Sequence, residues 1–205
     1  MEIKSSGGNR VTFMRYGKRW RTVRSILHKL LTPNMTKSYS PIQTYEAKQL
    51  SVNLLDEPED FYMHNRRYSA STILNITYGR RIPKCKSPLL THLIAGDCEE
   101  IRKIYSVLDR FSDVRRPGAY LVDTFPELTN NPIYNFFSNW RKIGNEYHRK
   151  DYAIYKEFWD TMVKEIEQGK AQHSFGKEFV QSDFKAMGVD EVQAAYIWYP
   201  RVDER

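Results

Sequence analysis

Long apolar runs are absent from this chain, and cysteine is scarce. No segment approaches the roughly eighteen consecutive apolar residues that a membrane-spanning helix needs, and no signal peptide is visible. The chain has 2 cysteines, Cys85 and Cys98. Such a pair does not form the disulfide framework of a small secreted domain, which favours a reducing compartment. These absences argue against a membrane-spanning or disulfide-stabilised class of protein.

The patterns of several common chemistries are also missing. The 10 glycines include no phosphate-binding loop. No set of a nucleophile and a base stands out. The 5 histidines lack the spacing of a helical metal-ligand pair. They are expected in structural or surface positions, and they are His28, His64, His92, His148 and His173. The sequence therefore predicts no catalytic residue and no metal site.

What remains is typical of a helical domain. A chain of 205 residues is long enough for one domain with a core. Its 40% hydrophobic and 28% charged residues are close to ordinary globular composition. Apolar spacing and the positions of proline and glycine predict the helices. They cover residues 17–31, 40–55, 59–78, 97–112, 136–168 and 176–185, with the start of another near 189–197. No alternating strand pattern is convincing, so the predicted fold class is all-α.

The sequence also predicts the apolar face of the second helix and the end of the third. In the second helix, Ala47, Leu50 and Leu54 are expected on one apolar face. Gly79 is expected to mark the end of the third helix, because glycine readily adopts the left-handed conformation that ends a helix.

Positive charge is concentrated near the beginning of the chain. Residues 1–37 hold nine Lys and Arg side chains against Glu2 alone, a net charge of +8, whereas the whole chain carries +7, so the other residues sum to about −1. The nine are Lys4, Arg10, Arg15, Lys18, Arg19, Arg21, Arg24, Lys29 and Lys37. Basicity of this kind raises nucleic acid or an anionic membrane as partners, although here it forms one local patch.

Residues 16–24, Tyr-Gly-Lys-Arg-Trp-Arg-Thr-Val-Arg, lie inside this basic stretch. Trp20 and Arg24 stand four apart and therefore share one face of a helix. The indole N–H and the guanidinium are both donors, and a planar guanidinium can hold a carboxylate with two hydrogen bonds. The pair therefore predicts a site for a carboxylate on a ligand. The alternative interpretation is a core tryptophan beside a solvated arginine.

This motif and several that follow it resemble the cytochrome P-450 haem-thiolate monooxygenases, in a style seen in filamentous fungi. The Tyr-Gly-x-x-Trp-Arg-x-x-Arg segment resembles their helix C. The other matching segments, in chain order, are Pro33–Met35, Asn65–Ser71, Ile76–Ile82, Gly118–Pro126 and Asp190–Tyr196. They resemble the C–D turn, helix E, its exit, the segment after helix F and the opening of helix I. The resemblance covers residues 10–196 of a single partial domain, 1–205, with a divergent tail at 197–205.

The resemblance implies roles for residues of the basic stretch. Trp20 and Arg24 are expected to bind the haem propionates. Arg21 and Lys29 lie on other faces of the same helix, on the side where the family docks an acidic reductase that depends on NADPH. For these two, a merely solvated basic face is an equally open interpretation.

The resemblance also implies a roof over a substrate pocket. Residues 97–125 resemble helix F with the loop beyond it, and residues 136–168 resemble helix G. Tyr120, Leu121 and Phe125 are then expected to line an access channel or to touch a membrane. The alternative is that these three side chains are ordinary core residues.

Several hallmarks of the family are not found in this chain. The haem-ligating cysteine loop is absent, since the contexts of Cys85 and Cys98 do not match it, and so are the helix I core and the Glu-x-x-Arg element. The expectation is a partial fold, from helix C to helix H with the start of helix I, lacking the β-rich N-terminal part and the haem-cysteine half. Such a fragment is expected to be inactive and not to retain haem.

Two functions from different classes follow. The first is a fragment of a haem- and O2-dependent monooxygenase that hydroxylates a small lipophilic substrate with electrons from an NADPH-dependent reductase. The parent family works at the endoplasmic reticulum membrane, and without the family's anchor this chain is expected in the cytoplasm. The alternative is a non-enzymatic basic helical remnant, or a module that binds nucleic acid or an anionic membrane. Of these partners, nucleic acid is not expected.

Overall fold

The computed structural model describes residues 5–83 and 98–182. Within these two ranges it contains helices and their connections and no strand, so the all-α prediction is confirmed. The α-helices are α2 (Lys18–Leu30), α3 (Pro33–Ser38), α4 (Ser40–Asp56), α5 (Phe61–Tyr78), α6 (Glu99–Arg115), α7 (Leu121–Thr124), α8 (Pro132–Phe137), α9 (Trp140–Glu167) and α10 (Phe175–Gln181). The short 3-10 helices are η1 (Val11–Phe13), η2 (Pro58–Asp60) and η3 (Pro126–Asn130).

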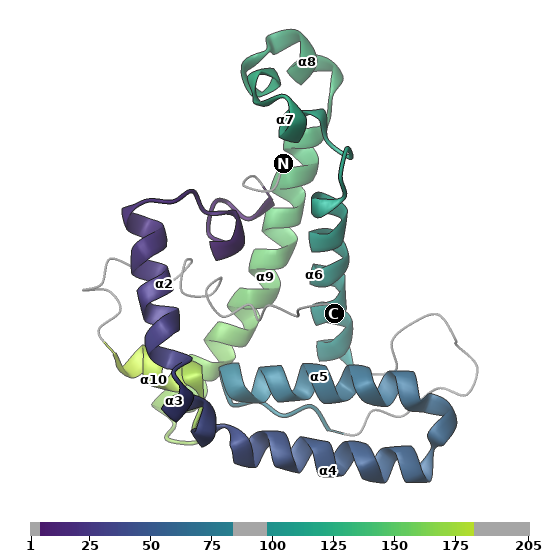
Figure 1. Cartoon of the computed structure of the whole chain (residues 1–205), viewed down its shortest axis with the longest axis vertical. Coiled ribbons are helices and arrows are strands. Elements are labelled where there is room, and N and C mark those ends of the chain that lie inside the picture. Colours follow the sequence, from purple (N-terminus) through teal and green to yellow (C-terminus); the bar gives the residue numbers. More distant parts are fainter. Residues whose placement is uncertain (1–4, 84–97, 183–205) are drawn as a thin grey trace.

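Two pairs of long helices set the architecture (Figure 1). Helices α6 and α9 lie side by side, and the antiparallel pair α4–α5 crosses their lower ends, where α5 contacts both α6 and α9. Helices α7 and α8, joined by η3, form a cap beyond the upper ends of α6 and α9. The first long helix, α2, stands apart from α6 and the cap, and α10 packs against α5 and α9.

The core consists of two separate clusters among the described residues. The larger one joins α2, α5, α6, α9 and α10, and its most buried large side chains include Ile101, Met162 and Phe179. The smaller one lies under the cap and consists of Val114, Val122 and Trp140 with partly buried neighbours. The cap therefore has a small core of its own.

Local sequence explains several helix ends. The side chain of Thr32 accepts a hydrogen bond from the backbone N–H of Met35, and Pro33 occupies the first turn of α3, so the segment predicted as a turn is a capped short helix. Gly79 has φ 69° and ends α5, which confirms the prediction at this position. A Cβ at Gly176 would collide with the side chain of Met162, so glycine permits the close approach of α10 to α9.

One predicted helix is two helices in the structure. The segment 136–168 was expected to be continuous, but α8 ends at Phe137 and α9 begins at Trp140. Ser138 is extended, with ψ 144°. The indole N–H of Trp140 donates to Asn135 Oδ1 at 3.1 Å, so one side-chain hydrogen bond joins the two helices across the break.

The apolar face predicted for α4 is not the face that the structure buries. Ala47 is exposed and Leu50 and Leu54 are only half-buried, whereas Glu46 and Asn53 are fully buried. An apolar pattern alone cannot identify such a face, because the residues that are buried in α4 are polar.

Glu46 is buried because three donors converge on its carboxylate. Arg67 Nη1 lies 2.8 Å from Oε2, and Arg81 Nε lies 2.9 Å from Oε1. The hydroxyl of Ser71 also donates to Oε1 at 2.9 Å. A buried carboxylate is tolerated only when it is paired and hydrogen-bonded. This polar cluster is what joins α4 to α5 and to the segment after it.

Two further sequence predictions concern the last predicted helix and the cysteines. The helix predicted near 189–197 lies outside the described residues. Cys98 is disulfide-bonded, which the sequence did not predict.

Candidate functional site

The start of α2 carries positive charge that nothing in the helix offsets. Gly17 precedes the helix without a side-chain cap, and the first turn contains no acidic residue. The N-terminal end of a helix already carries partial positive charge from its free N–H groups. The first turns of α2 therefore attract an anion.

The predicted donor pair comes together on this helix. The guanidinium carbon of Arg24 lies 5.2 Å from the centroid of the Trp20 ring, and the ring of Tyr16 lies 5.2 Å from the same indole. Val23 and Ile26 point another way, into the main core, with 0% and 4% of their surface exposed. Trp20 is half-buried and Arg24 is exposed, so the pair lies at the edge of the core.

Neither side chain of the pair has an acceptor in the part of the chain that the structure describes. Within residues 5–83 and 98–182, no hydrogen bond or ion pair joins the indole of Trp20 or the guanidinium of Arg24 to another group. Stacking on the indole orients the guanidinium plane while leaving its N–H groups free to donate. The donor set fits the carboxylates of a haem, which are the groups that the resemblance assigns to it.

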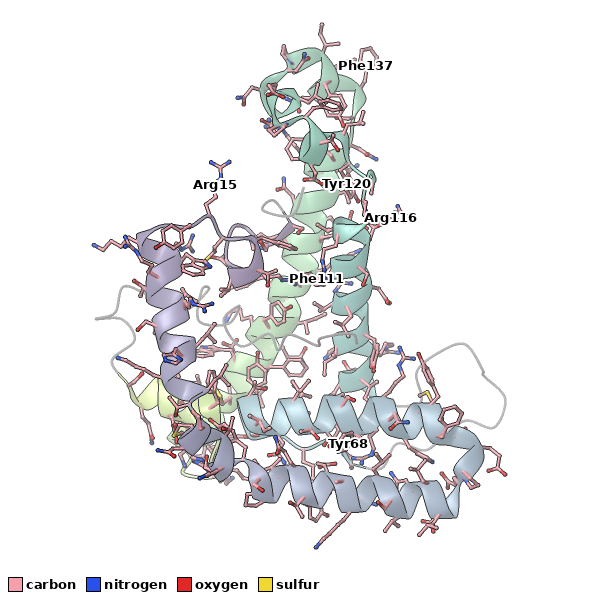
Figure 2. The ribbon with its side chains drawn as sticks, in the orientation of Figure 1. Arg15, Tyr68, Phe111, Arg116, Tyr120 and Phe137 are labelled. Atoms are coloured by element: carbon pink, nitrogen blue, oxygen red, sulfur yellow. The ribbon has the colours of Figure 1, made fainter. Side chains whose placement is uncertain are left out.

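The other cations of this region form a basic surface, defined here as Arg15, Lys18, Arg21 and Lys29. All four are exposed, and in the part of the chain that the structure describes none has an ion-pair partner. The guanidinium of Arg21 lies 5.7 Å from the ring centroid of Tyr16. Figure 2 shows Arg15 pointing away from the body of the protein. The predicted docking residues Arg21 and Lys29 are thus accessible to an acidic partner.

Tyr120 differs from the other predicted channel residues. Its hydroxyl donates to Asp113 Oδ2 at 2.9 Å, and the hydroxyl of Tyr147 donates to the same oxygen at 3.0 Å. Burial raises the pKa of Tyr120, and the hydrogen bond to Asp113 raises it further. The side chain is therefore fixed between α6 and α9, where it holds the start of the cap.

Leu121 and Phe125 lie on the surface, with 52% and 54% of their area exposed. Three further apolar residues of the cap are even more exposed, namely Ile133, Phe136 and Phe137. Figure 2 shows Phe137 at the outer tip. These five residues are called the apolar cap below. Exposed apolar groups that gather in one region are typical of a surface that contacts a membrane, a partner or a ligand.

Sequence reasoning missed three members of the apolar cap. It placed Phe136 and Phe137 at the start of one long aromatic-rich helix. The prolines at positions 126 and 132 were the available signal, since each begins a short helix in the structure.

Among the described residues, no group of three or more His, Cys, Asp and Glu side chains is placed to hold a metal ion. The same part of the chain has no helix long and apolar enough to cross a membrane.

Curated cytochrome P-450 monooxygenases of fungi match nearly the whole chain. One from Clonostachys rogersoniana is 31% identical over 193 residues, which are 93% of this chain and 34% of that protein. One from Aspergillus terreus is 34% identical over 197 residues, 94% of this chain and 32% of that protein. One from Postia placenta is 31% identical over 192 residues, 94% of this chain and 35% of that protein. The chain matches no family model and no solved structure.

The helical fold, the order of the motifs and these identities define the class: the chain belongs to the cytochrome P-450 family. Within that family it is a segment of the fungal type. The chain spans about a third of the length of the curated relatives it matches.

Proposed function

We propose that this chain supplies the haem-propionate site of a fungal-type monooxygenase that hydroxylates a small lipophilic substrate. The observation that carries the proposal is the stacked pair of Trp20 and Arg24, whose N–H groups have no acceptor among the described residues. Haem, when bound, supplies the oxygen chemistry, and the protein binds and orients it. The work assigned to this chain is to hold the two carboxylates at the start of α2.

The energetics favour a carboxylate at this place. A hydrogen bond between charged groups contributes roughly 1.5–3 kcal/mol, and a planar guanidinium can form two parallel bonds with one carboxylate. The indole holds the guanidinium in one orientation, which lowers the conformational entropy that binding removes. The free N–H groups of the first turn of α2 add attraction for an anion.

A comparison of two porphyrins tests the proposal. Haemin and its dimethyl ester, in which both propionates are blocked, are titrated into the full chain and followed by absorbance. Stable retention of haem is not expected of this chain, but its binding of added porphyrin should still be tighter for haemin than for the ester. Arg24→Met should reduce that preference on the order of 10-fold. Trp20→Phe removes the indole donor and should reduce the preference less.

The matched control is Arg21→Met, an exposed arginine on the same helix that has no propionate role in the proposal. It should leave the preference for haemin unchanged. Equal binding of haemin and its ester by the wild-type chain, or equal effects of the two arginine substitutions, would contradict the proposal.

The basic surface supports a second part of the proposed function, the docking of an acidic reductase that depends on NADPH. Arg21 and Lys29 are exposed and have no ion pair among the described residues. Complementary charge mainly accelerates association and makes it depend on salt. The double substitution Arg21→Glu and Lys29→Glu should therefore slow association with a soluble reductase domain, most strongly at low ionic strength.

The same surface supports the alternative of an anionic partner, such as nucleic acid or an anionic membrane. Binding to DNA would fall steeply as salt is raised, because counterions are released on binding. Tight DNA binding at physiological salt, lost in the same double variant, would favour this alternative over reductase docking.

The apolar cap supports the third part, a lipophilic substrate that enters from a membrane of the endoplasmic reticulum. Leu121 and Phe125 are assigned to the entrance, whereas Tyr120 is assigned to the support of the cap rather than to its surface. No residue of this chain is proposed as a catalytic group.

A further inference from the structure

An ionic triad, with Arg10 and Asp151 buried and Arg110 half-buried, ties the beginning of the described chain to α6 and α9. Arg10 is 4% exposed and Asp151 is 2% exposed. Arg10 Nη2 lies 3.2 Å from Asp151 Oδ2, and Arg110 Nε lies 2.6 Å from Asp151 Oδ1. Asp151 belongs to α9 and Arg110 to α6, so one carboxylate joins three parts of the chain.

Residues 5–15, called the strap below, also contact α6 and α9 through aromatic groups. The guanidinium carbon of Arg10 lies 4.6 Å from the ring centroid of Phe111, and the rings of Phe13 and Phe111 are stacked 5.4 Å apart. Arg10 Nη2 also donates to the hydroxyl of Tyr155 at 3.1 Å. Figure 2 shows Phe111 on the side of α6 that faces the strap.

The backbone of the strap lies close against α9. Gly7 has φ 59°, and a Cβ at this position would lie 2.9 Å from the ring of His148. Ser6 is fully buried. Glycine is favoured here because its φ is positive, and any larger residue would also displace the ring of His148.

The triad is expected to add little net stability but to hold the strap in one position on α6 and α9. Burial raises the pKa of Asp151, and the two arginines oppose that shift. Buried ion pairs often add little net stability compared with apolar packing, yet removing one partner leaves an uncompensated charge. An arginine in such a place needs a defined position, because its planar fork matches a carboxylate in few orientations.

The strap leads directly into the helix that carries the candidate site. Only Tyr16 and Gly17 separate it from α2. Arg19 Nη2 donates to Asn9 Oδ1 at 2.5 Å, so α2 is hydrogen-bonded to the strap residue beside Arg10. Tyr16 in turn contacts the ring of Trp20.

We propose that Arg10 is a positioning residue: with Asp151 and Arg110 it fixes the strap on α6 and α9, and through Asn9 and Tyr16 the strap sets the place of Trp20 and Arg24. The proposal rests on the proposed function only for the ligand that Trp20 and Arg24 bind. The placement itself is a property of the chain without any ligand.

Amide hydrogen exchange of the full chain without haem tests this placement. Arg10→Met should raise exchange in the strap and in the first two turns of α2 on the order of 10-fold, because the strap loses its anchor. Exchange in α4 and α5 should stay unchanged. The control is Asp160→Asn, which removes the exposed pair of Asp160 with Lys156 on the same helix α9, and it should change neither region.

A second variant keeps the test decisive if Arg10→Met unfolds the chain. Tyr155→Phe removes only the hydroxyl that accepts from Arg10 and should give a smaller rise confined to the same two regions. Its effect on Trp20 can be read separately from the 19F signal of 5-fluorotryptophan, assigned with Trp20→Phe. A rise in the strap that leaves α2 and the Trp20 signal unchanged would overturn the proposal, as would no rise at all.

Haemin binding separates this proposal from the proposed function. If the strap variants loosen α2 but the wild-type chain shows no preference for haemin over its ester, the placement stands and the propionate assignment fails. If Arg24→Met removes the preference while the strap variants leave α2 unchanged, the propionate assignment stands and the role of Arg10 fails.

Discussion

The α4–α5 pair and the cap are built in opposite ways. The pair is joined by a fully buried carboxylate, Glu46, that accepts from two arginines and a serine. The cap is held by one half-buried carboxylate, Asp113, that accepts from two tyrosine hydroxyls, and by a small apolar cluster. Its outer surface exposes the five residues of the apolar cap.

This difference indicates which region opens first. Local opening is easiest where few apolar groups are buried and where the hydrogen bonds are accessible to water. The pair contributes Leu74 and Tyr78 to the main core, whereas the cap rests on a separate small cluster. We expect the cap to open in excursions that leave α4 and α5 folded, which suits a region proposed to admit a substrate.

The largest effect is expected at Glu46. Glu46→Gln should lower the free energy of unfolding by about 3–5 kcal/mol, because Arg67 then remains buried without a countercharge. Among the described residues, two nitrogens of Arg67 already have no hydrogen-bond partner, so the guanidinium depends on Glu46 for its countercharge. Urea unfolding followed by circular dichroism measures the change.

Glu146→Gln is the matched control for this prediction, because Glu146 forms an exposed pair with Lys150. Exposed pairs contribute about 0–1 kcal/mol. If both variants lowered the free energy of unfolding by the same small amount, the buried carboxylate of Glu46 would not be what makes the α4–α5 pair more stable than the cap.

A smaller and local effect is expected at Asp113. Asp113→Asn weakens both tyrosine hydrogen bonds and removes the pair with the exposed Arg116. We expect faster hydrogen exchange in residues 121–137, corresponding to about 1–2 kcal/mol, with no change in α4 and α5. Equal changes in both regions would mean that the cap does not open independently.

Sequence patterns predicted the long helices because their apolar residues recur at helical spacing, as Ile101 and Ile104 do on α6. They predicted from a separation of four residues that Trp20 and Arg24 share one face of a helix, and the structure places the two side chains together. They failed where burial depends on partners far along the chain. The buried carboxylate of Glu46 pairs with Arg67, which is 21 positions away in the sequence. The buried carboxylate of Asp151 pairs with Arg10, which is 141 positions away.

The cap should also respond to alkaline pH. The folded chain raises the pKa of Tyr120 and of Tyr147 above their ordinary value of 10.0, through burial and Asp113. Since the unfolded chain loses these protons first, the stabilisation is fully present below pH 10 and is lost as the pH rises further. The urea midpoint of the wild-type chain should therefore fall between pH 10 and 11.

Tyr120→Phe should show a flatter decline than the wild-type chain over this range, because it has lost one of the two hydroxyls that titrate beside Asp113. Tyr62→Phe is the control, since Tyr62 is 62% exposed. If the urea midpoints of the Tyr120 variant and the wild type fell in parallel with pH, the Tyr120 hydroxyl would not contribute to the stability of the cap.

The smallest effect on stability is expected at the tip of the cap, where Phe136 and Phe137 are each 83% exposed. Replacing both with serine should change the free energy of unfolding by less than about 0.5 kcal/mol, as exposed substitutions usually do. Partitioning into zwitterionic lipid vesicles should nevertheless fall on the order of 10-fold or more, because burying one Phe side chain contributes about 1.5–3 kcal/mol. Phe61→Ser removes a comparably apolar side chain, 58% exposed, at the corner of α4 and α5. If this control weakened vesicle binding as strongly, the exposed aromatics of the two regions would be equivalent, and the assignment of the membrane contact to the cap would be wrong.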